Sequence, residues 1–207
     1  MKTITDIKPQ AKNPTRCSIY LDNAFYCGLE LETVMRHRLK IGQSISPDTL
    51  DEIQCDSERV HAMDKALYFI SKSKKTKKQV EEHLKQKGYT DQTVNAVMEK
   101  LEDYRFVSDG DYAYDYVKSY SKSKGKRLIA MELKLKGVSE SDMASALDSV
   151  EDETENAVKI AEKYLKNKPK DKVNMLKCYK YLLSKGFSYD TAKTAAERIC
   201  QSEDDIF

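Results

Sequence analysis

The sequence predicts an all-α protein of three tandem three-helix repeats that form an elongated, curved array, with a small β-containing N-terminal part. Three observations predict this fold. A twelve-residue pattern occurs three times at intervals of 49 residues in the 207-residue chain, which is typical of repeat arrays. Apolar residues follow each copy at helical spacing. Before the first repeat, short β-prone segments replace this helical pattern.

The repeated pattern is a helix end, a glycine turn and the start of the next helix. Its copies are HLKQKGYTDQTV (83–94), ELKLKGVSESDM (132–143) and YLLSKGFSYDTA (181–192). A glycine can adopt the left-handed conformation that ends a helix, and the Thr or Ser two positions later can cap the next helix. The structural signature of the repeat is therefore Gly88, Gly137 and Gly186 with Leu84, Leu133 and Leu182.

A further helix is expected before each of these joints, because apolar or aromatic residues recur there at helical spacing. The predicted stripes are Val60, Met63, Leu67 and Ile70; Tyr112, Tyr116 and Tyr120; and Ala157, Ile160 and Tyr164. The three tyrosines could stack on nucleic-acid bases, but core packing is the interpretation that we favour. The expected divisions of the chain are a β-containing part at 1–45 and helical repeats at 46–107, 108–149 and 150–207.

The first 45 residues are expected to contain strands. TITDIK (3–8), RCSIYL (16–21) and AFYCGL (24–29) are β-prone, and Asp22-Asn23 can join the last two as a hairpin. Ser46-Pro47 then predicts the start of a helix, with serine as the cap and proline at the first helical position.

The composition favours a folded, soluble, helix-rich protein. Charged residues make up 34 % of the chain and apolar residues 40 %, and the apolar residues are spread along its length, unlike a disordered chain. No segment approaches the roughly 18 apolar residues of a membrane span, and the N-terminus lacks the apolar core of a secretory signal. The five cysteines have no metal-site spacing, which fits reduced thiols in the cytoplasm.

Catalytic motifs are weak, so an enzyme is not expected. SKGKR (123–127) resembles the end of a phosphate-binding loop, but Tyr120 stands where that loop needs glycine and Arg127 where it needs Ser or Thr,. The three histidines lie far apart in the sequence, and no serine or cysteine occupies a nucleophile motif. We therefore expect no catalytic residues, no metal and no cofactor.

Three lysine-rich segments carry the functional hypothesis. KSKKTKK (72–78), KSYSKSKGKR (118–127) and KYLKNKPKDK (163–172) fall between the first and second helices of their repeats, and we call them the first, second and third basic connections. They are either solvated loops or, as we favour, a row of basic patches that contact an acidic or nucleoprotein partner. The candidate contact residues are Lys72, Lys74, Lys75, Lys77, Lys78, Lys118, Lys122, Lys124, Lys126, Arg127, Lys163, Lys166, Lys168, Lys170 and Lys172.

The position of some of these lysines also points to function. Lys77, Lys78 and Lys172 fall in the expected first turn of a second helix, where a cation opposes the helix dipole at a cost of about 0.3–1 kcal/mol. Stability therefore does not explain their placement. The formal net charge is only +2, whereas a dedicated DNA-binding protein is usually far more basic.

The central block FVSDGDYAYDYVKSYSKSKGKRLIAMELKLKGV (106–138) resembles the signature of the RecX family. ALYFISKSKKTKKQVEEHLKQKGY (66–89) resembles the first repeat of that family, although Val80 stands where leucine is more usual, and the third repeat is a looser match. The resemblance covers most of the chain. The matching residues of the central block are Asp109, Tyr112, Ala113, Tyr116, Gly125, Ile129, Glu132, Leu133, Lys136, Gly137 and Val138.

The resemblance implies a non-enzymatic bacterial regulator of the RecA recombinase, active in homologous recombination, DNA repair and the SOS response. Members of the family bind in the groove of the RecA–DNA filament and modulate strand exchange, ATP hydrolysis and filament growth, and inhibition is the direction that we expect. The implied partner is the RecA filament, with contact to single- or double-stranded DNA left open, and we expect a cytoplasmic monomer without membrane contact. The alternatives are a direct DNA-binding protein with helix-turn-helix-like repeats and a protein-interaction scaffold whose lysines only solubilise it.

Overall fold

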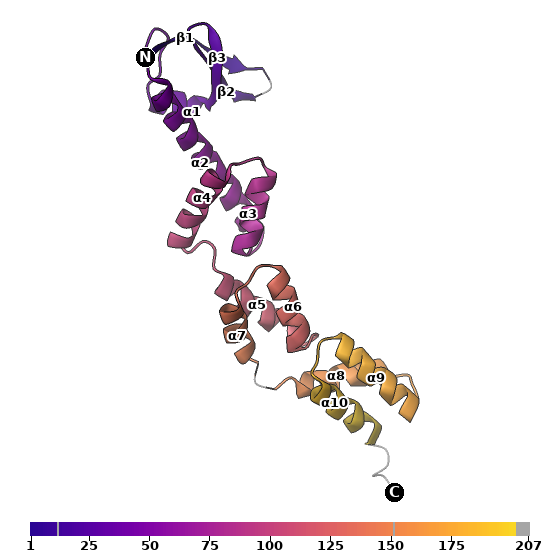
Figure 1. Cartoon of the computed structure of the whole chain (residues 1–207). Helices are drawn as coiled ribbons and strands as arrows, with labels where there is room; N and C mark the ends of the chain where they lie inside the picture. The colour runs from indigo at the N-terminus through magenta and orange to yellow at the C-terminus, as the bar shows by residue number, and fades with distance from the viewer. Residues whose placement is uncertain (12, 151, 202–207) are drawn as a thin grey trace. The chain divides into compact units, whose positions relative to one another are not determined.

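The computed structural model describes residues 1–11, 13–150 and 152–201. Within these residues the chain forms one four-stranded sheet and ten helices, in the predicted order of a β-containing part and three three-helix repeats (Figure 1). The chain divides into two compact units, and each is described by itself. One unit consists of residues 1–73 and 80–106, and the other consists of residues 74–79 and 107–207.

The N-terminal sheet has the strand order β3-β2-β1-β4, and all neighbouring strands are antiparallel. Asp22 and Asn23 join the second and third strands with φ angles of 49° and 67°. Two consecutive left-handed residues match the twist of a tight hairpin, so the predicted hairpin is confirmed. The strands are β1 (Lys2–Gln10), β2 (Asn13–Leu21), β3 (Ala24–Glu30) and β4 (Ser44–Ile45).

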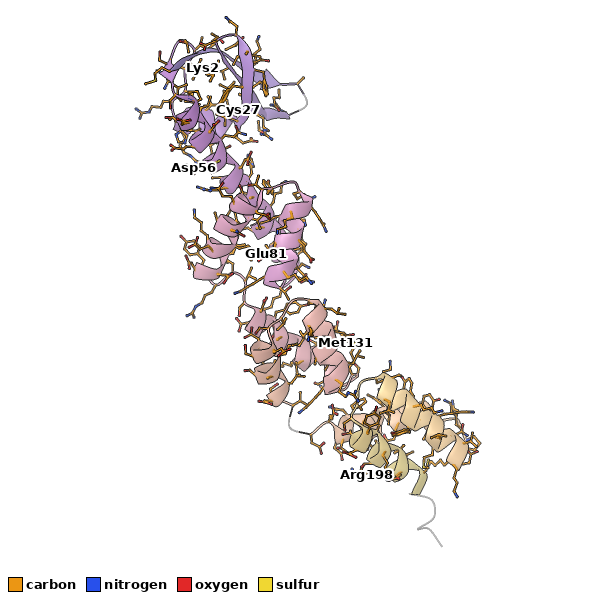
Figure 2. The ribbon with its side chains drawn as sticks, viewed as in Figure 1. Lys2, Cys27, Asp56, Glu81, Met131 and Arg198 are labelled. Carbon is orange, nitrogen blue, oxygen red and sulfur yellow. The ribbon has the colours of Figure 1, made fainter. Side chains whose placement is uncertain are left out.

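The sheet shares one apolar core with the short helix α1 (Leu31–Arg36) and the first part of α2 (Pro47–Lys72). Ile19 of β2 and Leu50 of α2 are fully buried in this core, and Cys27 of β3, labelled in Figure 2, is 5 % exposed. Removal of these side chains from water is the main stabilising term for such a small sheet.

The long helix α2 begins where the sequence predicts. The Ser46 hydroxyl accepts a hydrogen bond from the amide of Thr49 at 3.1 Å, and Pro47 is the first helical residue. Proline suits this position because its missing amide would have no partner within the helix. With 26 residues, α2 is long enough to serve both the N-terminal core and the first repeat.

Each repeat contains three helices, and α2 is the first helix of the first repeat. None of the helices in the described residues is long and apolar enough to cross a membrane. The other helices are α3 (Lys77–Gln86) and α4 (Asp91–Asp103) in the first repeat, α5 (Asp109–Tyr120), α6 (Lys126–Leu135) and α7 (Glu140–Asp148) in the second, and α8 (Thr154–Leu165), α9 (Lys172–Ser184) and α10 (Tyr189–Gln201) in the third.

A glycine turn joins the second and third helices of each repeat. The φ angles of Gly88, Gly137 and Gly186 are 89°, 86° and 87°, in the left-handed region that was predicted for them. In each turn the residue after the glycine donates its amide hydrogen to the carbonyl oxygen of a fully buried leucine, which closes the helix end. These amide–carbonyl pairs are Tyr89 with Leu84 (3.4 Å), Val138 with Leu133 (3.1 Å) and Phe187 with Leu182 (3.3 Å).

The first repeat uses smaller core residues than the sequence analysis predicts. Ala62 and Ala66 of α2 are fully buried, whereas Val60 is 38 % exposed and the other residues of the predicted stripe are half-buried. Three residues of the predicted stripe are therefore partly buried, whereas Val60 does not belong to the buried face. Small side chains let two helices approach closely, and α2 packs against α4 at this level.

The tyrosines of α5 lie beside the core of the second repeat. Ala113 and Val117 are fully buried in that core, and Tyr112 and Tyr116 are half-buried against it. Core packing is therefore confirmed for these two tyrosines. Tyr120 is the last residue of α5 and is 39 % exposed.

Candidate functional site

The three basic connections lie between the first and second helices of their repeats, as predicted. The irregular residues are 73–76 between α2 and α3, 121–125 between α5 and α6, and 166–171 between α8 and α9. The three connections differ in what they contact. The first two contact the following repeat, whereas Pro169 and Asp171 of the third accept hydrogen bonds from Asn174 of the same repeat.

The first basic connection docks on the second repeat through Thr76, which is fully buried. Thr76 Oγ1 donates a hydrogen bond to the carbonyl oxygen of Lys136 in the next glycine turn, at 2.7 Å. The same hydroxyl accepts from the amide of Gln79 at 3.3 Å, and Gln79 Oε1 accepts from the amide of Thr76 at 3.1 Å, a capping box that starts α3. The amide of Lys77 donates to Asp109 Oδ1 of α5 at 2.8 Å. This short segment therefore starts α3 and belongs to the same compact unit as the second repeat.

Two lysine side chains of the first basic connection also bind the second repeat. Lys78 Nζ donates to the carbonyl oxygen of Leu135 at the C-terminal end of α6, at 3.2 Å. Lys74 forms an ion pair with Asp115 of α5, and the hydrogen bond from Lys74 to this carboxylate raises the pKa of Lys74. A cation is favourable at the negative end of a helix. The prediction that stability does not explain the position of Lys78 is therefore wrong, because its ammonium group donates a hydrogen bond to a carbonyl oxygen in the last turn of α6.

The second basic connection makes the equivalent contact with the third repeat through its backbone. The amide of Gly125 donates to the carbonyl oxygen of Lys185 at 2.9 Å, and the amide of Arg127 donates to that of Gly186 at 3.1 Å. A Cβ atom on Gly125 would overlap the carbonyl group of Gly186 and the amide nitrogen of Phe187. Glycine is therefore required at position 125 for close approach of the two repeats, and not for an unusual φ angle, which is −79°.

Two further contacts fix this joint between the second and third repeats. The amide of Lys126 donates to Glu153 Oε2 at the start of α8, at 2.9 Å. The guanidinium carbon of Arg127 lies 5.3 Å from the ring centre of Tyr189 in α10, within the range of a cation–π contact. The carboxylate at the start of the following repeat thus caps the second helix of the preceding one at both joints, through Asp109 and Glu153.

Lys124 is the most constrained of the candidate lysines in the second basic connection. Its Nζ lies 2.6 and 2.7 Å from the two carboxylate oxygens of Glu132 in α6, and Tyr116 donates its hydroxyl to the same carboxylate at 2.8 Å. Burial alone would raise the pKa of Glu132, but the hydrogen bonds from Lys124 and Tyr116 outweigh it and lower this pKa. Burial and the same carboxylate raise the pKa of Tyr116. This network fixes the connection against α6.

The third basic connection is the exposed one. Its lysines at 166, 168 and 170 all face solvent, and Lys168 Nζ lies 3.2 Å from the ring centre of Tyr164. The segment ends at Asp171, whose carboxylate accepts the amide of Asn174 at 2.7 Å and caps α9. A surface pocket of about 520 Å³ lies beside it, lined by Glu162, Leu165, Lys166, Lys168, Pro169, Lys170 and Ile199.

Most of the candidate contact residues are exposed in the structure. The half-buried candidates all belong to the first two connections and are Lys75, Lys77, Lys124 and Lys126. The exposed candidates are Lys72, Lys74, Lys78, Lys118, Lys122, Arg127, Lys163, Lys166, Lys168, Lys170 and Lys172. Their role in partner contact stays a prediction.

A lysine of each basic connection lies over a tyrosine four residues earlier. An aromatic face beside a cation can bind a nucleobase and a phosphate together. The distances from Nζ to the ring centre are 4.4 Å for Lys72 and Tyr68, 4.4 Å for Lys124 and Tyr120, and 3.2 Å for Lys168 and Tyr164.

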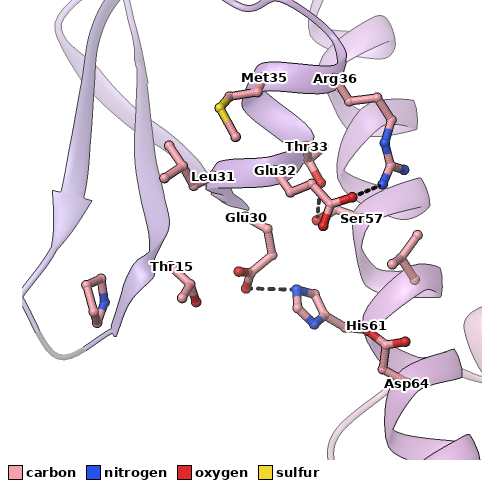
Figure 3. Close-up of a pocket in the computed structure, with 12 residues that line it drawn as sticks. Thr15, Glu30, Leu31, Glu32, Thr33, Met35, Arg36, Ser57, His61 and Asp64 are labelled. Atoms are coloured by element: carbon pink, nitrogen blue, oxygen red, sulfur yellow. Dashed lines mark hydrogen bonds and ion pairs between the residues drawn. The ribbon is translucent and has the colours of Figure 1, made fainter.

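A separate pocket of about 400 Å³ lies in the N-terminal unit, lined by residues of β2, β3, α1 and α2 (Figure 3). A carboxylate oxygen of Glu30 lies 2.8 Å from Nε2 of His61 and forms an ion pair with Arg16 at 3.4 Å, and Thr33 donates a hydrogen bond to Ser57 at 3.0 Å. Most of these polar groups pair with one another, although Nε of Arg16 is buried without a hydrogen-bond partner among the described residues, and the pairing is typical of a structural network. Elsewhere in the part of the chain that the structure describes, no three His, Cys, Asp or Glu side chains gather in a way that could hold a metal.

Sequence analysis missed the contact role of Thr76 and of Gly125, although it named Gly125 as part of the family signature. They lie immediately before the second helices of their repeats, and they are separated by 49 residues, the same interval as the glycine turns. This shared interval is the signal that could have identified them as one recurring contact. Their different side chains hid it, because threonine uses its hydroxyl and glycine its backbone amide.

Four family models match successive parts of the chain. They are the regulatory protein RecX N-terminal domain at residues 2–46 and the first, second and third RecX three-helix domains at residues 62–101, 108–147 and 151–195.

Similar proteins and solved structures carry the same name. The regulatory protein RecX of Bacillus subtilis (strain 168) is 33 % identical and covers 99 % of this chain and 80 % of its own length. That of Clostridium perfringens (strain 13 / Type A) is 32 % identical, with 98 % and 99 % covered. A crystal structure of regulatory protein RecX matches with a TM-score of 0.69 and 25 % identity over 95 % of this chain and 100 % of that chain. RecX from Lactobacillus salivarius matches with a TM-score of 0.64 and 28 % identity over 69 % and 96 %.

Proposed function

Because the chain belongs to the RecX family, we propose that it regulates a RecA-type recombinase as an inhibitor. It binds in the groove of RecA–DNA filaments and modulates strand exchange, ATP hydrolysis and filament growth. It needs no catalytic residue for this role, because occupation of the groove is itself the inhibitory event.

The observation that carries the proposal is the open third basic connection. Lys166, Lys168 and Lys172 are exposed, and none of the three has an ion-pair partner among the described residues. A cluster of solvated ammonium groups attracts phosphates or carboxylates of a nucleoprotein. The first two connections contribute fewer available charges, since Lys74 and Lys124 are paired with Asp115 and Glu132.

The repeat architecture supports a binding mode of several weak contacts. Within the C-terminal unit, the joint at Gly125 and Gly186 holds the second and third repeats in fixed register. Basic connections on successive repeats can then bind successive sites of a filament. After the first contact the next one is intramolecular, so its entropic cost is smaller than that of independent binding. Affinity arises from the sum, so no deep pocket is needed.

A binding comparison tests the proposal. Labelled full-length protein is titrated onto bare single-stranded DNA and onto the same DNA coated with RecA, at several salt concentrations. We expect tighter binding to the coated DNA and slower strand exchange when the protein is added. Equal or tighter binding to bare DNA, with a steep salt dependence, would contradict filament binding.

The contribution of the third basic connection is tested by charge reversal. Lys166→Glu, Lys168→Glu, Lys170→Glu and Lys172→Glu are combined in one variant, and a matched control reverses four exposed lysines outside the connections, Lys2, Lys40, Lys65 and Lys100. We expect the first variant to weaken binding to RecA-coated DNA by at least about tenfold, and the control to weaken it much less. Equal losses would mean that only net charge matters.

Direct DNA binding is the second candidate function, and the tyrosine–lysine pairs favour it. Tyr68 beside Lys72 is 64 % exposed and can stack on an unpaired base. Tyr68→Ala distinguishes the two candidates, because it weakens binding to bare single-stranded DNA only if the ring stacks on a base. Under filament-groove binding alone, this variant binds RecA-coated DNA as the wild type does.

A further inference from the structure

Helix α9 is apolar on two opposite faces. One face carries Cys178 and Leu182, which are fully buried in the core of the third repeat. The other carries Val173 and Leu176, which are 61 % and 52 % exposed. A helix that is apolar on two faces is normally buried on both, yet within the described residues the second face has no cover.

At the corresponding position of the preceding repeats, the chain contacts the glycine turn or helix end of the following repeat. Leu176 lies ten residues before the glycine of its turn, as Lys78 and Arg127 do in the first two repeats. Lys78 contacts the carbonyl end of α6, and the backbone of Arg127 contacts Gly186. The third repeat has a leucine at this position, where the first two repeats have a basic residue.

A groove continues this apolar surface toward α10. It has a volume of about 230 Å³, which is room for a large apolar side chain. We call Val173, Leu176 and the groove together the α9–α10 face. The groove is lined by Met175, Leu176, Tyr179, Lys193, Ala196 and Glu197.

Lysines surround the α9–α10 face. Lys172, Lys177 and Lys180 are exposed on α9, and Lys193 is exposed on α10. None of the four has an ion-pair partner among the residues that the structure describes. Glu197 is the only acidic residue among the described residues that line the groove. An apolar centre with a positive rim is complementary to an apolar segment flanked by carboxylates.

We propose that the α9–α10 face binds an amphipathic helix of a partner protein whose apolar stripe is flanked by Asp and Glu. Leucine-sized side chains at i, i+3 or i+4 and i+7 enter the groove and cover Val173 and Leu176. The flanking carboxylates pair with the lysine rim. The inference goes beyond regulation of a recombinase and does not rest on it, because the face is defined by its own geometry and charge.

Other occupants fit this surface less well. A nucleic acid would bring phosphates to the rim but would leave Val173 and Leu176 without apolar contacts. A basic helix would be repelled by four lysines. A second copy of the chain could place one of its glycine turns on this face. The carboxylate of Asp171, next to the face, would then lie against the carbonyl oxygens of that turn, and neither group can donate a hydrogen bond.

Peptide binding to the full chain tests the proposal. The probe is a labelled synthetic helix of about eighteen residues, long enough to be helical, with leucine at i, i+3 or i+4 and i+7 and glutamate on both flanks. One comparison peptide has lysine in place of glutamate, and another has serine in place of leucine. We expect only the leucine–glutamate peptide to bind, and Leu176→Glu to weaken it at least about tenfold.

Variants of the protein make the test specific. Leu176→Glu changes an exposed side chain, so its unfolding midpoint should match that of the wild type. Ile41→Glu, at a residue that is 62 % exposed in the N-terminal part, is the matched control and should bind the peptide normally. The double variant Lys177→Glu/Lys180→Glu should lose the glutamate peptide and gain affinity for the lysine peptide.

Three results would overturn the proposal. They are no binding of the leucine–glutamate peptide, equal binding to the wild type and to Leu176→Glu, and a wild-type self-association that Leu176→Glu abolishes. The last result, seen by sedimentation equilibrium, would identify a second copy as the occupant. Because the probe contains neither RecA nor DNA, these results are independent of whether the chain binds recombinase filaments.

Discussion

The first two basic connections and the third are similar in lysine content but differ in what they contact. Thr76 and Gly125, the last residues before α3 and α6, donate hydrogen bonds to the glycine turn of the following repeat. Asp171, the last residue before α9, instead accepts a hydrogen bond from Asn174 in its own helix. Lysine content therefore does not distinguish an internal joint from an open surface.

The chemistry of one position explains the difference. A glycine turn presents carbonyl oxygens, so the residue that docks on it has to supply a donor, and a threonine hydroxyl or a glycine amide does so. An aspartate carboxylate is acceptor-only and would meet those oxygens with like partial charge. The Asp171 side chain is thus unsuited to docking on a glycine turn, and Lys166, Lys168 and Lys172 of the third basic connection are exposed.

The largest effect on stability is expected when the close approach between Gly125 and the third glycine turn is removed. Gly125→Ala places a Cβ where the carbonyl group of Gly186 and the amide of Phe187 lie, and neither backbone group can move without disturbing the glycine turn. We expect a loss of about 3 kcal/mol in the free energy of unfolding of the C-terminal unit, as for severe overpacking. Urea denaturation measures the loss, and hydrogen exchange of the Arg127 amide locates it.

The matched control for this substitution is Gly88→Ala in the first glycine turn. Gly88 has a φ angle of 89°, and a Cβ there would meet nothing within 4 Å. Its cost is therefore conformational only, about 1–2 kcal/mol. If Gly88→Ala destabilised the protein as much as Gly125→Ala, the overlap at the second joint would not be the cause.

Local features of the fold were predictable from sequence. The glycine turns, the Ser46 cap and the Asp22-Asn23 hairpin depend on the conformations of a few neighbouring residues, and each was placed correctly. The full burial of Ala62 and Ala66 in α2 was not predicted, because alanine carries little hydrophobic signal. Their burial depends on how closely another helix approaches, which is a tertiary property.

The candidate site was only partly predictable. Lysine clusters at equivalent positions could be seen in the sequence, but the pairing of Lys124 with Glu132 and of Lys74 with Asp115 could not. Those partners lie on other helices, and periodicity gives no information on which charges meet. The exposed face at Leu176 was missed for a related reason, since an outward apolar residue has the same pattern as an inward one.

A smaller effect is expected from Thr76→Val, which keeps the shape of the side chain and removes the hydroxyl. The variant loses the hydrogen bond to the Lys136 carbonyl and the cap on the Gln79 amide, so we expect a loss of about 2 kcal/mol in stability. Thr90→Val is the control, because Thr90 caps α4 through Thr93 at 3.3 Å and is exposed. It should cost about 1 kcal/mol. Equal losses for the two variants in urea denaturation would mean that the contact between repeats contributes nothing.

The smallest effect on stability is expected at Glu132. Its ion pair with Lys124 is a difference between the second basic connection and the third. The two side chains are 25 % and 24 % exposed, so Glu132→Gln should cost about 1 kcal/mol at neutral pH. The pKa of Glu132 is lowered from 4.5 in the folded state. Its contribution is therefore present above about pH 4.5 and is lost as the pH falls through the folded-state pKa.

The difference in unfolding free energy between wild type and Glu132→Gln should thus shrink in acid. Glu155→Gln is the control, because Glu155 and its partner Arg198 are 68 % and 54 % exposed, and such surface pairs contribute little. Urea denaturation of all three proteins between neutral pH and about pH 3 gives the profile. A difference that is constant with pH would show that the Glu132 carboxylate is not what holds Lys124, and the second connection would then be as open to partners as the third.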